Sequence, residues 1–524
     1  MLGALVVRDE PRLSEYFALG LSVATLVALA VGATLRRRAR RSTRWAVGVL
    51  LFLGGLGVAA SQNWFRGQGR YPVHPTDFFH YYVGARYFEQ VGYQDLYTCS
   101  VAALRSRGFK DDDWGIRDLR RNVVVPIREL EPAIRACPER FAPDEWQHFV
   151  DDIDHLARLI GPRNFQRLLS DHGFNAPPFW VVAAKAAIRA AGNTAEGATR
   201  LIWIDTLLVA LGGWILLRTF GPRTFCLAMV FLGCHTANRF GWVGGSLLRM
   251  DWWFWCVVAV ALLRTRPFAA GAAWAYASAL RLFPLLLGIG PLIRGVLRDR
   301  RIPRIASRPA FRMLAGAITG GLILLALSWP LGNIGAWREF AARIQTHGEA
   351  LSFNHVGLKS LLSASPDATL SSLSSTQHGG DLEALWRTTR EEAFQRRRVA
   401  HGLAVIAFVA GMLWLAFRGS ARTTLATLSL ALVPVVTALS SYYMSLLALL
   451  AVPARRRPPL AWAMMGAVVL TQLLQQRSHR QLGIDTYFDL ISATDVALVA
   501  FFFAYLVAAS IRSEATVTPP DDGA

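Results

Sequence analysis

A polar and aromatic stretch directly after an apolar segment carries the residues best suited to chemistry. It reads Thr76-Asp77-Phe78-Phe79-His80-Tyr81-Tyr82-Val83-Gly84-Ala85-Arg86-Tyr87 and is followed by Gly92 and Asp95-Leu96-Tyr97. As a helix, it places Asp77 on one face with His80 and Tyr81, and one turn further with Gly84, whose missing side chain leaves a gap. A single carboxylate beside aromatic rings suits a general base that acts on a sugar hydroxyl. The alternative is an interfacial aromatic belt in which Asp77 caps the helix N-terminus.

The composition predicts that this stretch belongs to a membrane protein. Of 524 residues, 53% are hydrophobic and only 18% are charged, and apolar runs of about 20 residues, long enough to cross a bilayer, recur throughout the chain. The net charge of +20 comes largely from arginines in short loops between these runs, such as 36–41 and 455–457. This is the positive-inside pattern, so we do not expect nucleic-acid binding.

The apolar runs predict an all-α polytopic protein of about 12–13 transmembrane helices, with short interfacial helices on its outer loops. The predicted spans are 14–35, 45–63, 198–217, 223–240, 246–264, 267–280, 282–293, 312–330, 399–416, 423–439, 442–453, 459–474 and 489–510. Residues 267–280 and 282–293 form a hairpin with Arg281 at its tip. The helix from Pro177-Pro178 to Ala191 carries Lys185 and Arg189, so we expect it at the outer interface.

Five regions follow from these spans. Residues 1–44 hold an additional N-terminal helix and a basic loop, and 45–330 form the membrane core, which includes an outer loop at 66–172. Residues 331–397 are a second outer loop with a mobile Ser-rich piece at 363–380. Residues 398–511 are C-terminal transmembrane helices, and 512–524 are a disordered tail. Arg396 to Arg398 lie on the outer side in this topology, against the charge bias.

Cysteine and acidic residues give little support for a metal or redox site. The chain has five cysteines and no CxxC pair, and Cys99 with Cys137, both in the first outer loop, are the candidates for a disulfide in an oxidising compartment. The acidic run Asp111 to Asp113 lacks continued oxygen-ligand spacing and is expected to be a solvated loop. We therefore expect no metal and no cofactor.

Ionisable and polar residues converge on one membrane face in this topology. A carboxylate in the first outer loop, together with cations at distant helix ends, suits a lipid-phosphate substrate and a sugar acceptor. The members of this set are Asp77, His235, Asn238, Arg239, Arg281, His347, Asn354, His355, Tyr442 and Tyr443.

The segment from Asp77 to Arg86, with Gly92 and Leu96-Tyr97, resembles the first-loop signature of GT-C superfamily glycosyltransferases. The similarity is greatest to the bacterial branch that uses polyprenyl-phosphate sugars and includes mycobacterial mannosyltransferases. Pro177-Pro178-Phe179 resembles the Pro-Pro helix of that family, and Arg200-Leu201 the start of its next span. Further resemblances, over residues 45 to 455 in all, are Gly244-Gly245, Ala270-Gly271, Arg281 to Pro284, Trp337, Phe340, Asn354 and Gly357.

The chain departs from the family pattern at two places. Arg281 stands where the family has Lys, which keeps the charge but changes its geometry. Ser246 to Arg249 replace the usual Gln and Asn, so the substrate fit differs there.

The resemblance implies roles for the candidate residues. Asp77 would be the general base of an inverting transfer, because retention calls for a second, nucleophilic carboxylate. Arg281 would hold the departing polyprenyl phosphate, with Arg239 and Arg249 as further candidates. The alternatives are a snorkelling Arg281 and an ion pair between Arg249 and Asp251. Substrate contacts are expected from His80, Tyr81, His347, Asn354, His355 and Tyr442. The alternatives are that the histidines are simply solvated and that the tyrosines form an aromatic girdle at the membrane interface.

Together with these residues, the resemblance implies a hexosyltransferase that moves a mannose-like hexose or a pentose from a polyprenyl phosphate to a lipid or glycan acceptor. The active site would face the periplasm or cell exterior from a multi-pass protein of the cytoplasmic membrane, in contact with membrane lipids. The main alternative is a transporter or flippase for a lipid or polyol, which predicts repeats of broken helices and charges near the bilayer midplane. A non-catalytic scaffold would not need Asp77, Arg281 and the second outer loop to meet in one cavity.

Overall fold

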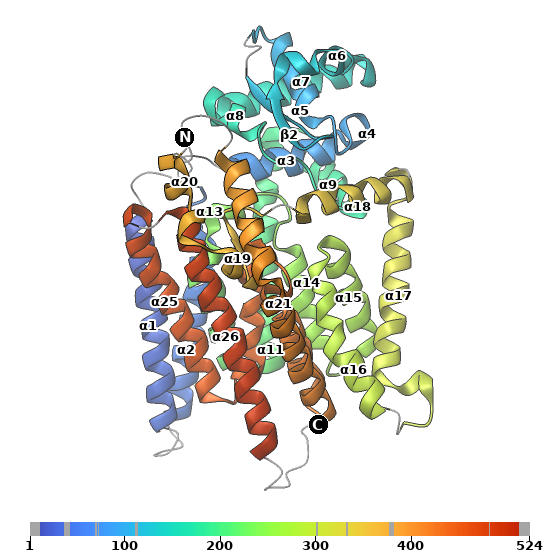
Figure 1. Ribbon diagram of the computed structural model, residues 1–524. Helices are drawn as coiled ribbons and strands as arrows, with labels where there is room; N and C mark the ends of the chain where they lie inside the picture. Colours follow the sequence, from blue (N-terminus) through green and yellow to red (C-terminus); the bar gives the residue numbers. More distant parts are fainter. Residues whose placement is uncertain are drawn as a thin grey trace.

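Apolar helices lie side by side in a bundle, and a polar helical layer covers one end of it (Figure 1). This computed structural model describes residues 11–35, 42–68, 71, 73–110, 114–299, 302–331, 334–349, 351–376, 382–481 and 483–512. The arginine cluster 36–41, the acidic run 111–113 and most of the tail, 513–524, lie outside the described residues. The predicted class, an all-α polytopic membrane protein, is confirmed.

The bundle has a helix at every predicted span. Prolines begin several of these helices, where the fixed φ of proline suits the first turn and its missing N–H has no partner to lose. The bundle consists of α1 (Pro11–Leu35), α2 (Ser42–Ser61), α11 (Trp203–Phe220), α12 (Pro222–Cys234), α14 (Asp251–Leu262), α15 (Pro267–Leu280), η7 (Phe283–Gly288), α16 (Ile289–Arg298), α17 (Pro309–Leu327), α21 (Leu382–Phe417), α22 (Arg422–Leu430), α23 (Val433–Val436), η12 (Ser441–Leu450), α24 (Ala451–Ala454), α25 (Pro458–Gln481) and α26 (Ile484–Arg512).

Six helical segments in the described chain are long and apolar enough to cross a bilayer by themselves. Four shorter apolar segments are Pro222–Cys234, Asp251–Leu262, Arg422–Val436 and Ser441–Ala454. A segment of 10–17 residues is too short to span about 30 Å at 1.5 Å per residue. These short helices therefore end inside the bundle, where irregular backbone is tolerated because it lies within protein or lines a cavity.

The layer over the bundle, residues 75–190, is termed the cap. It is held by the disulfide Cys99–Cys137 and by a two-stranded antiparallel sheet that the sequence did not predict. Its elements are α3 (Pro75–Arg86), α4 (Phe88–Val91), α5 (Leu96–Ser106), β1 (Gly115–Asp118), β2 (Val123–Pro126), η3 (Ile127–Leu130), α6 (Glu131–Arg135), η4 (Pro138–Arg140), α7 (Pro143–Ile160), α8 (Pro162–Leu168) and α9 (Pro178–Ala190). The helix with Lys185 thus belongs to the cap, beside Glu89.

Arginines gather at the end of the bundle opposite the cap, termed the basic end. Their side chains bind the last carbonyl groups of neighbouring helices or pair with a carboxylate there, which offsets the negative helix C-termini. The contacts are Arg264 to Thr219 O (2.7 Å), Arg298 to Phe417 O (3.0 Å), Arg418 to Ser510 O (3.0 Å) and Arg422 to Asp299 (2.9 Å).

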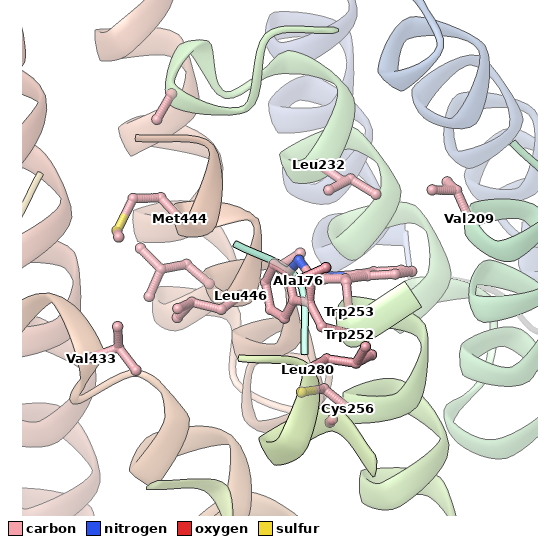
Figure 2. Packing of buried hydrophobic residues seen from close by; sticks show 14 of the residues in the cluster. Ala176, Val209, Leu232, Trp252, Trp253, Cys256, Leu280, Val433, Met444 and Leu446 are labelled. Carbon is pink, nitrogen blue, oxygen red and sulfur yellow. The ribbon is translucent and has the colours of Figure 1, made fainter. Parts of the chain in front are cut away.

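The short helices contribute the side chains that pack in the core of the bundle. Trp252 and Trp253 begin α14 and are buried between neighbouring helices (Figure 2). The indole N–H of Trp253 donates to Ser445 O at 3.2 Å. A Cβ at Gly212 would lie 2.6 Å from the Trp253 ring, so α11 approaches α14 closely only because it has a glycine there.

The second predicted outer loop is more ordered than the sequence indicated. The Ser-rich piece contains α19 (Leu358–Ser363), η11 (Pro366–Ala368) and α20 (Leu370–Thr376), while 377–380 lie outside the described residues. The 36-residue helix α21 is about 54 Å long at 1.5 Å per residue, so it extends well beyond a bilayer of about 30 Å. Arg396 to Arg398 lie along this helix and are exposed, which accounts for their conflict with the charge bias.

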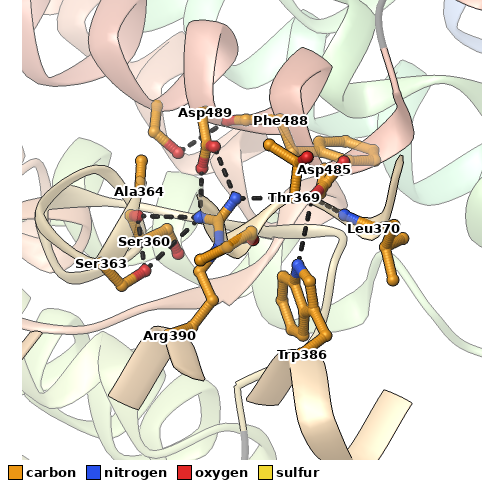
Figure 3. Close-up of polar contacts among 12 residues, drawn as sticks. Ser360, Ser363, Ala364, Thr369, Leu370, Trp386, Arg390, Asp485, Phe488 and Asp489 are labelled. Carbon is orange, nitrogen blue, oxygen red and sulfur yellow. Dashed lines mark hydrogen bonds and ion pairs between the residues drawn. The ribbon is translucent and has the colours of Figure 1, made fainter. Parts of the chain in front are cut away.

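A buried ion pair fixes α21 against the start of α26 (Figure 3). Arg390, with a side chain 2% exposed, donates to both carboxylate oxygens of Asp489 at 2.8 and 2.7 Å. Asp485 accepts from Trp386 Nε1 at 3.1 Å and from Leu370 N at 2.9 Å. This network joins the second loop to the bundle.

The remaining elements are short connections and one amphipathic helix, α18. They are η2 (Asn63–Phe65), α10 (Ala195–Ala198), η5 (Thr199–Ile202), η6 (Thr236–Asn238), α13 (Phe240–Val243), η9 (Ile305–Ser307), η10 (Trp329–Leu331), α18 (Ile334–Glu349), β3 (His355–Val356) and β4 (Leu439–Ser440).

Candidate active site

Asp77 lies in the first turn of α3, at the face of the cap that meets the bundle. Pro75 begins the helix, and the N-cap is His74, whose Nδ1 accepts from Asp77 N at 3.1 Å. The side chain of Asp77 therefore does not cap the helix. Its Oδ2 lies 3.0 Å from Nε of Arg249, and the carboxylate is 17% exposed.

Arg249 reaches Asp77 from a tight turn before α14. Gly245 and Leu248 have positive φ of 76° and 52°, which turns the chain back toward the cap. Asp205 of α11 accepts from the backbone N–H of Arg249 at 2.8 Å and of Met250 at 3.0 Å. The alternative pairing of Arg249 with Asp251 is wrong, because Arg249 pairs with Asp77 while Asp251 accepts from Trp252 N at 2.7 Å.

Tyr81 joins two arginines. Its hydroxyl accepts hydrogen bonds from Arg249 and, at 3.1 Å, from Arg281, and it donates to Asn175 Oδ1 at 2.7 Å. The Arg249 guanidinium also lies 4.3 Å from the centre of the Tyr81 ring, a cation–π distance. Tyr81, predicted to contact substrate, thus also sets the spacing of the two cations.

Arg281 follows the last residue of α15. Its Nη1 donates to Leu280 O at 2.8 Å, and its Nε, which is buried, has no hydrogen-bond partner among the described residues. No carboxylate in that part of the chain lies within ion-pair distance of the Arg281 guanidinium. The Tyr443 ring lies 6.0 Å away. Arg281 therefore donates hydrogen bonds to neutral oxygen atoms, while the charge of Asp251 acts on it from beyond ion-pair distance. A guanidinium without a carboxylate in direct contact can still take an anionic ligand.

One cavity of about 3570 Å³ is lined by Asp77, Tyr81, Asn175, Arg249 and Arg281. Its volume exceeds the 300–1,000 Å³ typical of sites for a single small ligand, so two substrates fit. The predicted site residues that line it are Asp77, His80, Tyr81, Arg239, Arg249, Arg281, Asn354, His355 and Tyr442. Thus Asp77, Arg281 and the second loop meet in one space, as the sequence predicted.

The second loop reaches the cavity through a short sheet. His355 and Val356 pair with Ser440 and Leu439, and Asn354 O accepts from Ser441 N at 2.9 Å. This pairing brings Asn354 and His355 beside Tyr442, whose hydroxyl accepts from Arg249 at 3.5 Å. Burial lowers the pKa of His355 to about 4, so this imidazole is neutral at pH 7.

The cap side of the cavity differs from the prediction in two details. His80 is buried, with Nε2 2.7 Å from the Tyr97 hydroxyl, and burial lowers its pKa, so it is a neutral member of the cap core as well as a lining residue. The gap predicted at Gly84 is filled, because a Cβ there would lie 2.6 Å from the ring of Phe174. Gly84 serves helix packing rather than ligand space.

One predicted cation lies apart from the group around Tyr81, and one predicted histidine side chain is not among the described residues. Arg239 lines the cavity beside α1 and pairs with Glu15 at 3.0 Å. His347 belongs to α18, but its side chain lies outside the described residues.

The sequence reading missed Asp205 and Asn175, which position Arg249 and Tyr81. Asp205 was detectable as an ionisable residue in an apolar run. Asn175 carried no signal beyond its place before Pro177. The described residues contain no group of three side chains suited to a metal ion.

The fold and the cavity define a multi-pass, all-α membrane protein with a charged chamber between a cap and a bundle of helices. No protein-family model, curated protein or solved structure matches this chain.

Proposed function

We propose that this protein is a glycosyltransferase of the GT-C type, which moves one sugar from a polyprenyl phosphate to an acceptor. The observation that carries the proposal is the arrangement around Tyr81. A carboxylate paired with one arginine faces the cavity, and the Tyr81 hydroxyl links that arginine to a second one, Arg281, which has no carboxylate within ion-pair distance among the described residues. The first group suits a base and the second suits a phosphate.

Asp77 would take the proton of the acceptor hydroxyl as its oxygen forms a bond to the anomeric carbon. The bond from that carbon to the phosphate oxygen breaks, and the phosphate leaves with the electron pair. Arg281 would stabilise the charge that develops on the leaving phosphate, since hydrogen bonds fixed in advance cost no reorganisation. With one carboxylate in this role, the transfer inverts the anomeric centre.

The surroundings of Arg281 support a lipid donor. Leu282 and Leu285 follow it, line the cavity and are 55% and 50% exposed. In a membrane protein, exposed leucines face lipid tails. A prenyl chain can therefore lie against Leu282 and Leu285 while its phosphate reaches Arg281.

The charge distribution supports a site on the outer face of the cytoplasmic membrane. Arginines gather at the basic end, which the positive-inside rule assigns to the cytoplasm. The disulfide Cys99–Cys137 lies in the cap, at the opposite end, and disulfides persist in oxidising compartments. The acceptor, a lipid or glycan, would thus be modified outside the cytoplasm.

One observation favours transport as the second candidate. His235 and Asp495 form a fully buried pair at 2.9 Å beside the cavity, and buried ionisable groups of this kind mark transport paths as well as binding sites. Transport alone gives no role to the pairing of Asp77 with Arg249 beside Arg281, which no described carboxylate contacts directly.

The test is an assay of the purified protein and its Asp77→Asn variant with a panel of polyprenyl-phosphate sugars, in which release of polyprenyl phosphate is measured. We expect the variant to lose at least about 100-fold in rate, the usual contribution of a general base. The control, Asp171→Asn, removes another carboxylate that lines the cavity and should change the rate by less than tenfold. Unchanged transfer by Asp77→Asn would exclude the base, and no transfer from any donor would favour transport.

A further inference from the structure

A second polar wall of the cavity lies on the side of α1, away from Arg281. It is termed the α1 wing and consists of Glu15, His235, Arg239, Gln472 and Tyr487. We propose that the α1 wing binds the carbohydrate part of the acceptor. This inference rests on the proposed function and names the chemistry of its second substrate.

Buried polar atoms in the α1 wing call for a ligand. Gln472 is 4% exposed, and its amide N–H donates to Cys234 O, but its Oε1 has no hydrogen-bond partner among the described residues. His235 is 1% exposed, with Nε2 against Asp495, and its Nδ1 is likewise unpartnered there. Buried polar atoms without partners are costly. Hydroxyl groups of a bound sugar would supply the missing donors.

The charge of the α1 wing favours a neutral polyol over an anion. Arg239 is paired with Glu15 at 3.0 Å, so the two side chains together carry no net charge. Arg281, by contrast, has no carboxylate within ion-pair distance in the described chain, and Asp251 acts on it only from farther away. A phosphate therefore prefers the Arg281 side, whereas amide, carboxylate and aromatic groups in the α1 wing suit hydroxyls and sugar rings.

A single segment of chain connects the α1 wing to Asp77. It begins at Arg239 and ends at Arg249, the partner of Asp77. The segment is fixed to the start of the cap, because Gln68 Nε2 donates to Phe240 O at 3.1 Å and His74 N donates to Gly245 O at 2.8 Å. A sugar in the α1 wing can thus extend along this segment and present a hydroxyl to Asp77.

The experiment measures sugar binding without donor or turnover, so its failure is distinct from failure of the proposed transfer. The full chain in lipid nanodiscs is titrated with octyl α-mannopyranoside and octyl β-glucopyranoside, and saturation transfer to the sugar protons is followed by NMR. We expect saturable binding by the wild type of at least one glycoside. Gln472→Leu should weaken it about tenfold, the equivalent of one lost hydrogen bond in a desolvated site.

A second variant and a matched control keep the result interpretable. Glu15→Gln removes a charge without a change of size and should weaken sugar binding by at least threefold. This variant supplies the test if Gln472→Leu does not fold. The control is Leu473→Ala, next to Gln472 but 46% exposed, which should bind as the wild type does. The proposal is overturned if no glycoside saturates, if both α1-wing variants bind normally, or if 1-octanol displaces the sugar signal equally well.

Discussion

Asp77 and Arg249 form an ion pair at 3.0 Å that joins the first helix of the cap to the turn before α14. Arg249 is the more buried partner, with a side chain 4% exposed against 17% for Asp77. Breaking such a pair leaves a charge without compensation. The pair therefore links the stability of the cap–bundle contact to the proposed chemistry.

We expect Arg249→Met to lower the free energy of unfolding by about 2 kcal/mol, less than a fully buried pair would cost because Asp77 borders the cavity. The Asp77→Asn/Arg249→Met double variant should lose less than the sum of the single variants, with a coupling of about 1 kcal/mol. Denaturation of the purified proteins measures this cycle. Arg158→Met removes an exposed cap arginine, 73% accessible, and serves as the control. Strict additivity would show that the pair does not act as a unit.

Arg281→Gln should reduce kcat/KM for the lipid donor by about 100-fold, because it removes the charge that faces the leaving phosphate. Arg281→Lys keeps the charge but not the planar geometry, so it should lose only about tenfold. Steady-state kinetics with a donor that the wild type uses provide the measurement. Arg264→Gln, at the basic end, is the matched control. Equal rates for all three variants would remove Arg281 from the phosphate site.

Loss of the disulfide should destabilise the cap. The bridge closes a sequence separation of 38 residues, for which chain entropy gives a contribution of about 4 kcal/mol. The Cys99→Ala/Cys137→Ala variant should therefore melt at a lower temperature than the wild type under oxidising conditions. A reductant should lower the melting temperature of the wild type but not of the variant. A reductant effect of equal size in both proteins would contradict this assignment.

Acid should destabilise the protein through two half-buried histidines. Burial lowers the pKa of His172 and of His355 to about 4, against about 6.5 in the unfolded chain. Between these values the unfolded state binds more protons, so stability is fully present above pH 6.5 and is lost as the pH falls toward 4. Each histidine contributes at most about 3 kcal/mol to this loss.

Melting temperatures between pH 7.5 and 4.5 test this dependence. The His172→Asn/His355→Asn variant should show a shallower decline than the wild type. His148→Asn, which changes an exposed histidine of α7, should leave the decline unaltered. A decline of the same slope in all three proteins would exclude the imidazoles of His172 and His355 as its source.

The sequence alone determined the class of protein and the places of the apolar helices in the chain, but not that four of the predicted spans are too short to cross the bilayer. Apolar runs dictate membrane helices because the backbone must satisfy its hydrogen bonds internally in lipid. The run from Asp77 to Tyr81 also identified the polar face of α3, since residues three and four apart share one face of a helix. Arg281 was found for a similar local reason, as the charged tip of an apolar hairpin.

Only the tertiary structure decided which of these residues are partners. The sequence offered Asp251, two residues away, as the partner of Arg249, whereas the folded chain brings Asp77 there through the turn at Gly245 and Leu248. The folded chain also places Phe174 in the gap that the sequence predicted at Gly84. In addition, it separates Arg239 from Arg281. Periodicity reports the face on which a side chain lies, but not which distant segment covers that face. That choice depends on packing across the whole bundle, which no local pattern encodes.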